Sequence, residues 1–174
     1  MNNNAWFKKE KPLLSLQSMG GGAAGSLMQG AADKTYVDDV FSTYLYNGTS
    51  GSNTLTTGID NSDKGGLIWT KNRTSTDQHI LTDTVRGANH AIYSDAASAA
   101  STGSYNQIFT STGLTINNSF SQTNQSGYTY SLWNFAKVPG FLDIVTYTGN
   151  GSNRTISHSL GSVPGVIIIK RTDD

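Results

Sequence analysis

From Phe41 onward, apolar and polar residues alternate with the period of two that is typical of β-strands. Polar loops rich in Gly, Asn, Ser and Thr, which favour tight turns, separate these short runs. The runs with a strand pattern are 41–46, 54–57, 66–71, 79–83, 91–93, 106–110, 114–117 and 128–136. Many short strands without a convincing helical period predict an all-β fold, a β-sandwich or lectin-like jelly roll.

Two of these runs have a pattern that places them within a sheet. Run 66–71 is nearly continuous in apolar residues, so we expect it to be a central strand. Run 128–136 is the longest, with Tyr130 and Leu132 on one face and Trp133 and Phe135 on the other. Because this second face becomes apolar toward the end of the run, we expect that face to enter the core.

The central run 66–71 has a second copy at 165–170, each with a Gly, four mostly large apolar residues and a Lys. The flanking sequences agree as well, since a Tyr and a Gly precede each copy at 46–48 and 147–149. Such self-similarity indicates a repeated structural unit. The predicted organisation is an N-terminal attachment arm (1–40), a β-sandwich repeat (41–138) and the start of a second, truncated repeat (139–174).

The predicted arm, residues 1–40, carries large apolar side chains on a polar tether rich in Gly and Ala. A segment of this composition buries too little apolar surface to fold alone. A frayed terminus is one interpretation, but large apolar residues on an unpartnered arm favour docking on another protein. The expected partner-docking residues are Trp6, Phe7, Leu13 and Leu14.

Composition excludes several function classes. The formal net charge is +0 and only 14% of residues are charged, which argues against a nucleic-acid partner, because such proteins need a basic face. The chain has no Cys, which excludes disulfides, thiolate catalysis and cysteine-ligated zinc. No run of about 18 apolar residues is present, so we expect no membrane insertion.

The residues that could carry catalysis or bind metals do not form a recognisable motif. His79, His90 and His158 have no ligand spacing, and Glu10 is the only Glu. The oxygen-rich loop 60–63 could hold Ca²⁺, but its spacing departs from the calcium-loop pattern and turn formation explains it as well. We therefore expect no catalytic residue, no metal, no cofactor and no enzyme activity.

Two further groups of residues have a specific expected role. Asp83 and Arg86 are three positions apart on a turn, which predicts a local, exposed ion pair or an Asp cap rather than catalysis. Trp69, Tyr93 and Trp133 could stack on sugar rings, which makes them the candidate glycan contacts. Rings at alternate strand positions more often serve packing, so both roles stay open for these three residues.

Several motifs together resemble a known repeat. They are 44–48, 66–73, 83–87, 146–151 and 160–171. In this order they resemble an uncharacterised β-sandwich repeat of virion proteins from marine tailed phages, often tail-fibre-like, and the resemblance covers 41–174. The resemblance implies a virion structural protein, the N-terminal part of a tail fibre or tail appendage. The arm would dock on phage tail or portal-adaptor proteins, and the appendage would support host attachment as a homotrimer in the virion tail.

Three other functions remain open at this point. A carbohydrate-binding, lectin-like module would expose Trp69, Tyr93 or Trp133 in a groove and bind a host surface glycan. A capsid decoration protein would place the same sandwich elsewhere on the virion. A polysaccharide-degrading enzyme would need a pair of carboxylates across a cleft, and the scattered Asp83, Asp95 and Asp143 do not form such a motif.

Overall fold

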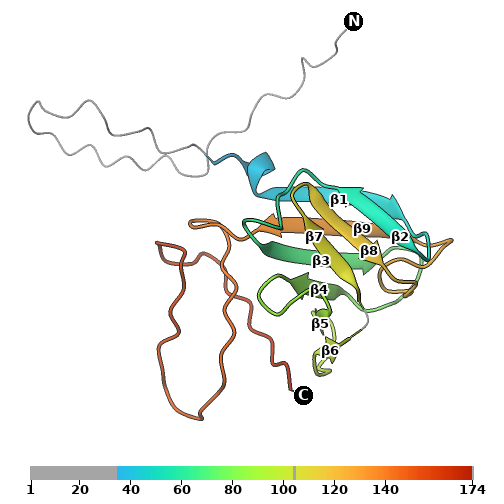
Figure 1. Ribbon diagram of the computed structural model, residues 1–174. Helices are drawn as coiled ribbons and strands as arrows, with labels where there is room; N and C mark the ends of the chain where they lie inside the picture. Colours follow the sequence, from blue (N-terminus) through green and yellow to red (C-terminus); the bar gives the residue numbers. More distant parts are fainter. Residues whose placement is uncertain (1–34, 104, 174) are drawn as a thin grey trace, which may run out of the picture.

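The computed structural model describes residues 35–103 and 105–173 (Figure 1). The predicted docking residues Trp6, Phe7, Leu13 and Leu14 lie outside the described residues. A single turn of 3₁₀ helix, η1 (Val37–Asp39), leads into the first strand. The rest of the described secondary structure is β-strand, so the prediction of an all-β fold is confirmed.

The strands follow one another closely along the chain, as the alternating pattern predicts. They are β1 (Phe41–Asn47), β2 (Ser52–Thr56), β3 (Gly66–Asn72), β4 (Ile80–Asp83), β5 (His90–Tyr93), β6 (Ser101–Thr102), β7 (Gln107–Thr110), β8 (Gly113–Asn117) and β9 (Thr129–Ala136). All strand pairs are antiparallel. The predicted hairpin about Ser111–Gly113 is present as the pair β7–β8.

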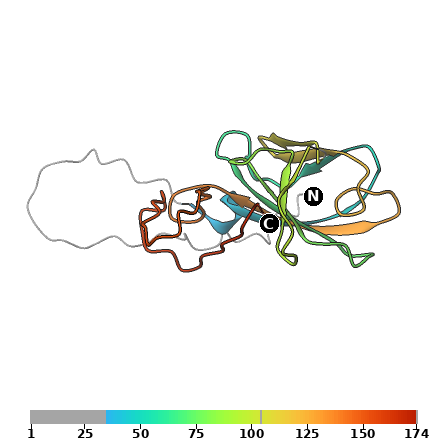
Figure 2. The same ribbon diagram turned by 90° about the horizontal axis from the view of Figure 1, so that it is seen from below.

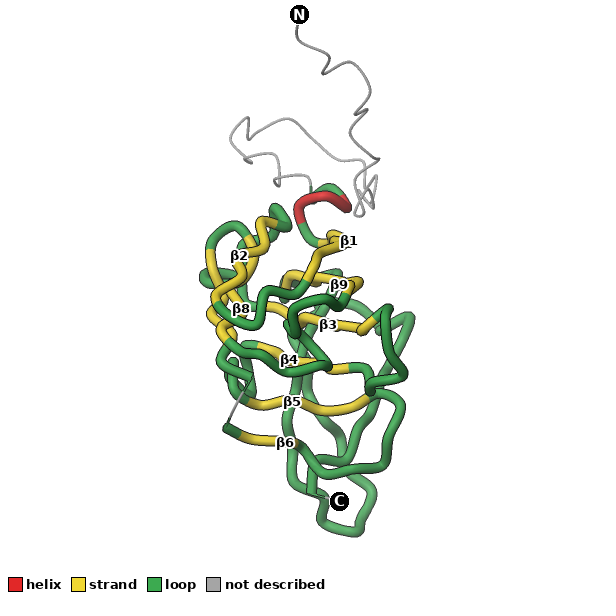
Figure 3. The backbone as a smooth tube through the Cα atoms, turned by 90° about the vertical axis from the view of Figure 1, so that its right-hand side faces the viewer, coloured by secondary structure: helices red, strands yellow, loops and turns green. Residues whose placement is uncertain are grey.

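Two sheets form the sandwich. The larger sheet has the order β1-β9-β3-β4-β5-β6, and the smaller sheet has the order β2-β8-β7. Strand β3 lies between β9 and β4, which confirms its predicted central position. Figure 3 shows the strands of the larger sheet stacked one above another, with β2 and β8 forming a layer beside them.

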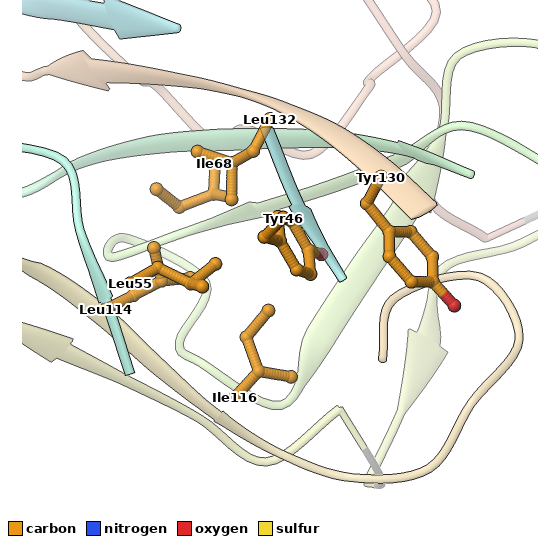
Figure 4. Close-up of a cluster of buried hydrophobic side chains, with 7 residues drawn as sticks. All are labelled: Tyr46, Leu55, Ile68, Leu114, Ile116, Tyr130 and Leu132. Atoms are coloured by element: carbon orange, nitrogen blue, oxygen red, sulfur yellow. The ribbon is translucent and has the colours of Figure 1, made fainter. Parts of the chain in front are cut away.

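The main core lies between the two sheets, and each sheet contributes side chains to it (Figure 4). Its buried members are Tyr46, Leu55, Ile68, Leu114, Ile116, Tyr130 and Leu132. The rings of Tyr46 and Tyr130 stack at 4.9 Å between centroids. Their hydroxyls donate to backbone carbonyls of one loop, at Thr123 and Ser121, so both buried phenol groups are hydrogen-bonded.

The longest strand, β9, buries the face opposite to the one expected. Tyr130, Leu132, Asn134 and Ala136 are buried, whereas Trp133 and its neighbours on the other face are half-buried. The expectation that the Trp133 face enters the core is therefore wrong. Both faces of this strand carry large side chains, so alternation alone does not identify the inner one, and the face that packs against the smaller sheet is the buried one.

The segment 139–173 lies to one side of the sandwich and contains no assigned strand (Figures 1 and 2). The second copy of the central run, 165–170, is largely exposed here, whereas β3 is half to fully buried. The physical difference is pairing, because β3 has β9 and β4 beside it, whereas 165–170 pairs with no strand in the described part of the chain. Whether 139–174 opens a second repeat stays a prediction.

Candidate functional site

The outer face of the larger sheet carries an aromatic cluster, which we define as Trp69, His79, Trp133 and Phe135. Trp69 on β3 is paired in register with Trp133 on β9, and their rings meet edge to face at 5.9 Å. The indole Nε1 of Trp69 donates to Nδ1 of His79 at 3.2 Å. Together the four side chains line a small cavity of about 220 Å³.

Tyr93, the third candidate glycan contact, lies on the other face of the sheet. Its partner in register is Ile80, which is paired in turn with Thr70 on the inner side of β3. The hydroxyl of Tyr93 lies 3.1 Å from that of Tyr105, and burial raises the pKa of Tyr105. The structure thus brings Trp69 and Trp133 together and places Tyr93 in a separate packed cluster.

The aromatic cluster offers little hydrogen bonding to a sugar. Its cavity walls are almost entirely apolar, and the one indole N–H of Trp69 is already used by His79. A sugar ring needs polar partners for its hydroxyls as well as an aromatic face. The geometry therefore suits an apolar side chain better than a saccharide.

The residues weighed as metal ligands are engaged in local structure. Oδ1 of Asp60 accepts the N–H groups of Ser62 and Asp63, both at 3.1 Å. The N–H of Asp63 and the hydroxyl of Ser62 lower the pKa of Asp60. Nδ1 of His158 accepts from the N–H of Leu160 at 3.3 Å. Within the described part of the chain, no group of three or more His, Cys, Asp or Glu residues could hold a metal ion.

Asp83 and Arg86 form the predicted pair, and Asp83 also caps the turn. Arg86 Nε donates to Asp83 Oδ2 at 2.6 Å, while Oδ1 accepts the N–H groups of Val85 and Arg86. The pair is not on the surface as expected, because the Asp83 side chain is only 2% exposed and that of Arg86 13%. Strand β4 is buried throughout, which carries the pair into the interior.

A larger, polar cleft opens at the end of the sandwich where β9 finishes. Its volume is about 650 Å³, and it lies between the loop 61–65, the turn after β4 and strand β7. Lys64, Thr84, Phe109 and Lys137 line it, together with the buried amides described next. This polar cleft is the second candidate site.

Two of the residues that line the polar cleft have buried side-chain amides. Gln107 on β7 is 3% exposed, and its Oε1 accepts the hydroxyl of Thr82 at 2.6 Å. Asn61 is 1% exposed, and its Nδ2 donates to the carbonyl of Gly113 at 3.2 Å. Among the described residues, nothing pairs with the remaining amide atoms, Nε2 of Gln107 and Oδ1 of Asn61.

Sequence reasoning missed Gln107 and weighed Asn61 only as part of the oxygen-rich loop. A signal was present for Gln107, because the alternation of β7 puts it on the same face as Phe109, which packs against the core, while Ile108 is exposed. Sequence alone could not show that β7 and the loop 61–65 meet, since they belong to different parts of the chain.

Comparison with known proteins adds a family but no function. The family model described as a domain of unknown function, DUF7483, matches residues 37–174. No curated protein and no solved structure matches the chain. In the described residues, no helix has the length and apolar character needed to span a membrane. The match covers both the sandwich and the segment 139–174, and the chain therefore belongs to the DUF7483 family.

Proposed function

We propose that the chain is a structural part of a phage virion, the N-terminal part of a tail fibre or related tail appendage. In this role residues 1–40 attach it to tail or portal-adaptor proteins, and the sandwich supports host attachment. The resemblance of 41–174 to a repeat of virion proteins supports the proposal. A rigid all-β sandwich suits a building block that must carry load without changing shape.

The observation that best supports the scaffold role is a run of apolar residues exposed to solvent. Val166, Ile167, Ile168 and Ile169 are exposed by 79%, 71%, 71% and 73%, and Val163 by 92%. Contiguous apolar surface of this kind favours burial against another polypeptide. Four β-branched residues in a row also suit pairing with a further strand. A second and a third copy of the chain would supply such a surface in a homotrimer.

The oligomeric state tests this role. Light scattering after size-exclusion chromatography is expected to give the mass of a trimer for the full chain. The double variant Ile167→Lys/Ile169→Lys should be monomeric, because it places two charges in the apolar run. Leu45→Lys is the matched control, since Leu45 is 66% exposed on β1 and lies outside the run. A monomeric wild-type chain would contradict the proposed assembly.

Attachment and location need a second experiment on virions. Deleting residues 1–34 leaves η1 and the buried Val40 in place, so the sandwich should fold. We expect the deleted chain, and the variant with Trp6, Phe7, Leu13 and Leu14 changed to Ser, to be lost from purified particles. Antibody labelling of intact particles should mark the tail. Labelling of the capsid would favour a decoration protein, and normal incorporation without the arm would remove its proposed role.

A further inference from the structure

Two Asn-Gly pairs occur in the chain, at 47–48 and 150–151, and the structure holds them differently. In such a pair the glycine nitrogen can attack the asparagine side chain, because glycine has no Cβ to hinder the approach. We propose that Asn150 is a site of spontaneous deamidation in the folded chain and that Asn47 is protected. This goes beyond a scaffold role, because it assigns a covalent modification to the chain, and it does not depend on the proposed assembly.

The reaction needs water and hydroxide and no other partner. Hydroxide takes the proton from the Gly151 N–H, and the nitrogen then forms a bond to Cγ of Asn150. The side-chain amide group takes up a proton and leaves as ammonia, which closes a cyclic imide. Water opens this imide at either carbonyl and gives aspartate or isoaspartate. The net change converts one amide and one water into a carboxylic acid and ammonia, with no oxidation or reduction.

The Gly151 nitrogen is open to this attack. Residues 145–155 are all exposed, and nothing lies within 4 Å of a Cβ added at Gly149 or Gly151, so the side chain of Asn150 has room to turn. In the described part of the chain, the N–H of Gly151 donates to no backbone carbonyl. No hydrogen bond of that kind therefore has to break before the nitrogen reacts.

The side-chain amide of Asn150 is also activated for the attack. The N–H of Ser152 donates to its Oδ1 at 3.1 Å. The attack places negative charge on this oxygen, and a donor that is already aimed at it stabilises that charge, as in an oxyanion hole. Arg154 closes the same loop, because its Nη1 donates to the carbonyl of Thr148 at 2.8 Å, and it adds a positive charge there.

Asn47 has the same neighbour in sequence but a different setting. It ends strand β1, and its carbonyl accepts Nδ2 of Asn53 at 2.9 Å. The N–H of Gly48 donates to the carbonyl of Tyr128 at 2.9 Å, and a Cβ added at Gly48 would lie 2.1 Å from the carbonyl oxygen of Gln125. This nitrogen is bonded and enclosed, so the end of β1 must open before it can attack.

The test follows both asparagines in one sample of the full chain, kept in a mildly alkaline buffer made with H₂¹⁸O. Peptide mapping by mass spectrometry should find ¹⁸O-labelled aspartate and isoaspartate at position 150. These products should form at least about tenfold faster there than at position 47, because only Asn47 has to wait for local opening. Equal rates at the two positions in the folded chain, or no product at position 150, would overturn the proposal.

The same measurement in guanidinium chloride separates the fold from the local sequence. In the denatured chain both pairs keep their reacting groups and lose their surroundings. The rate at Asn47 should therefore rise at least about tenfold, whereas the rate at Asn150 should stay nearly unchanged. If the rate at Asn150 rises as much as that at Asn47, the fold protects both positions and the assignment is wrong.

Variants in the exposed loop test the two parts of the mechanism without disturbing the sandwich. Ser152→Pro removes the N–H that holds Oδ1 of Asn150 and should slow the reaction by roughly two- to tenfold, the effect of one hydrogen bond. Ser152→Ala keeps that N–H and is the matched control. Gly151→Ala places a Cβ beside the attacking nitrogen and should slow the reaction in both the folded and the denatured chain. An unchanged rate in Gly151→Ala would overturn the imide route, and an unchanged rate in Ser152→Pro would overturn the activation by Ser152.

Discussion

At the scale of single residues, the effect of the Asp83–Arg86 pair on the stability of the fold depends on its burial at the turn after β4. In water an ion pair of this kind contributes little, because both charges are well solvated apart. At this buried position the two charges are largely shielded from water, and the Asp83 carboxylate also holds two backbone N–H groups of the turn. Removing one member of the pair should therefore cost more than the pair itself contributes.

We predict that Asp83→Asn lowers the free energy of unfolding by roughly 3–5 kcal/mol, because it leaves the guanidinium of Arg86 buried without its counter-ion. Urea denaturation followed by tryptophan fluorescence measures this change. Arg73→Ala, which removes an exposed Arg, is the control and should change stability by less than about 0.5 kcal/mol. A loss below about 1 kcal/mol for Asp83→Asn would mean that water reaches the pair.

Two glycines allow the effect of a strained φ angle to be separated from the effect of a steric clash when each is replaced by Ala. Gly113 has φ +151° at the start of β8, and a Cβ placed there would lie 2.2 Å from the carbonyl oxygen of Leu55. Gly58 has φ +86° with nothing within 4 Å of an added Cβ. Only the first position combines an unusual φ with a backbone clash.

We predict that Gly113→Ala destabilises the chain by more than 2 kcal/mol, at least about twice the roughly 1 kcal/mol expected from strain alone at Gly58→Ala. The reason is that β2 must move away from β8 to make room. Thermal unfolding of the two variants, monitored by circular dichroism, gives the comparison. Equal effects at the two positions would show that the β2–β8 pair adjusts without cost.

At the scale of elements, the strand pattern was predictable because it is local. Alternation and turn residues placed β1, β3, β7 and β8 within about two residues of their observed ends. Strand β6, Ser101–Thr102, was missed because two small polar residues carry no pattern and are recruited by β5. The inner face of β9 was missed because burial depends on the facing sheet, which the strand's own sequence does not specify.

The two copies of the central run have similar sequences but different packing, so the same substitution should affect stability differently in each. Ile68 in β3 is 0% exposed, and its counterpart Ile167 is 71% exposed. Ile68→Ala should cost about 2–5 kcal/mol, as large-to-small changes in a core do, whereas Ile167→Ala should leave the stability of the monomer nearly unchanged. Urea unfolding of dilute samples measures both. A comparable loss at Ile167 would indicate that 165–170 is a packed strand in solution.

At the scale of the whole molecule, the candidate sites depend on residues that meet only in the folded chain. Trp69 and Trp133 were singled out from their types, and β3–β9 pairing brings them together. The polar cleft could not be read from sequence, because Asn61 and Gln107 look like ordinary loop and strand residues until the sheets are assembled. Their unpaired amide atoms become visible only once the neighbours are known.

Within the segment after β9, Asp143 joins the start of the segment to Ser159, which gives the molecule a pH-dependent contact. Asp143 Oδ2 accepts the N–H of Ser159 at 2.6 Å and its hydroxyl at 2.9 Å, while Oδ1 faces Lys137. The Ser159 N–H, with its hydroxyl and Lys137, lowers the pKa of Asp143 to about 2. A depressed pKa means that the Asp143 carboxyl binds a proton more tightly when it is released from Ser159 and Lys137 than when it contacts them.

We predict that the stability contributed by the Asp143–Ser159 contact is fully present above about pH 4, the ordinary range of an Asp carboxyl, and is lost as the pH falls through about 2. The amide proton signal of Ser159 should titrate in that window and become rapidly exchanging with solvent at its lower end. In Asp143→Asn the signal should lack this titration and exchange rapidly even at neutral pH, because the neutral amide cannot compensate Lys137 and accepts more weakly. A Ser159 signal that is protected in the variant would mean that other contacts hold the segment, such as the bond from the Gly140 N–H to the Leu160 carbonyl.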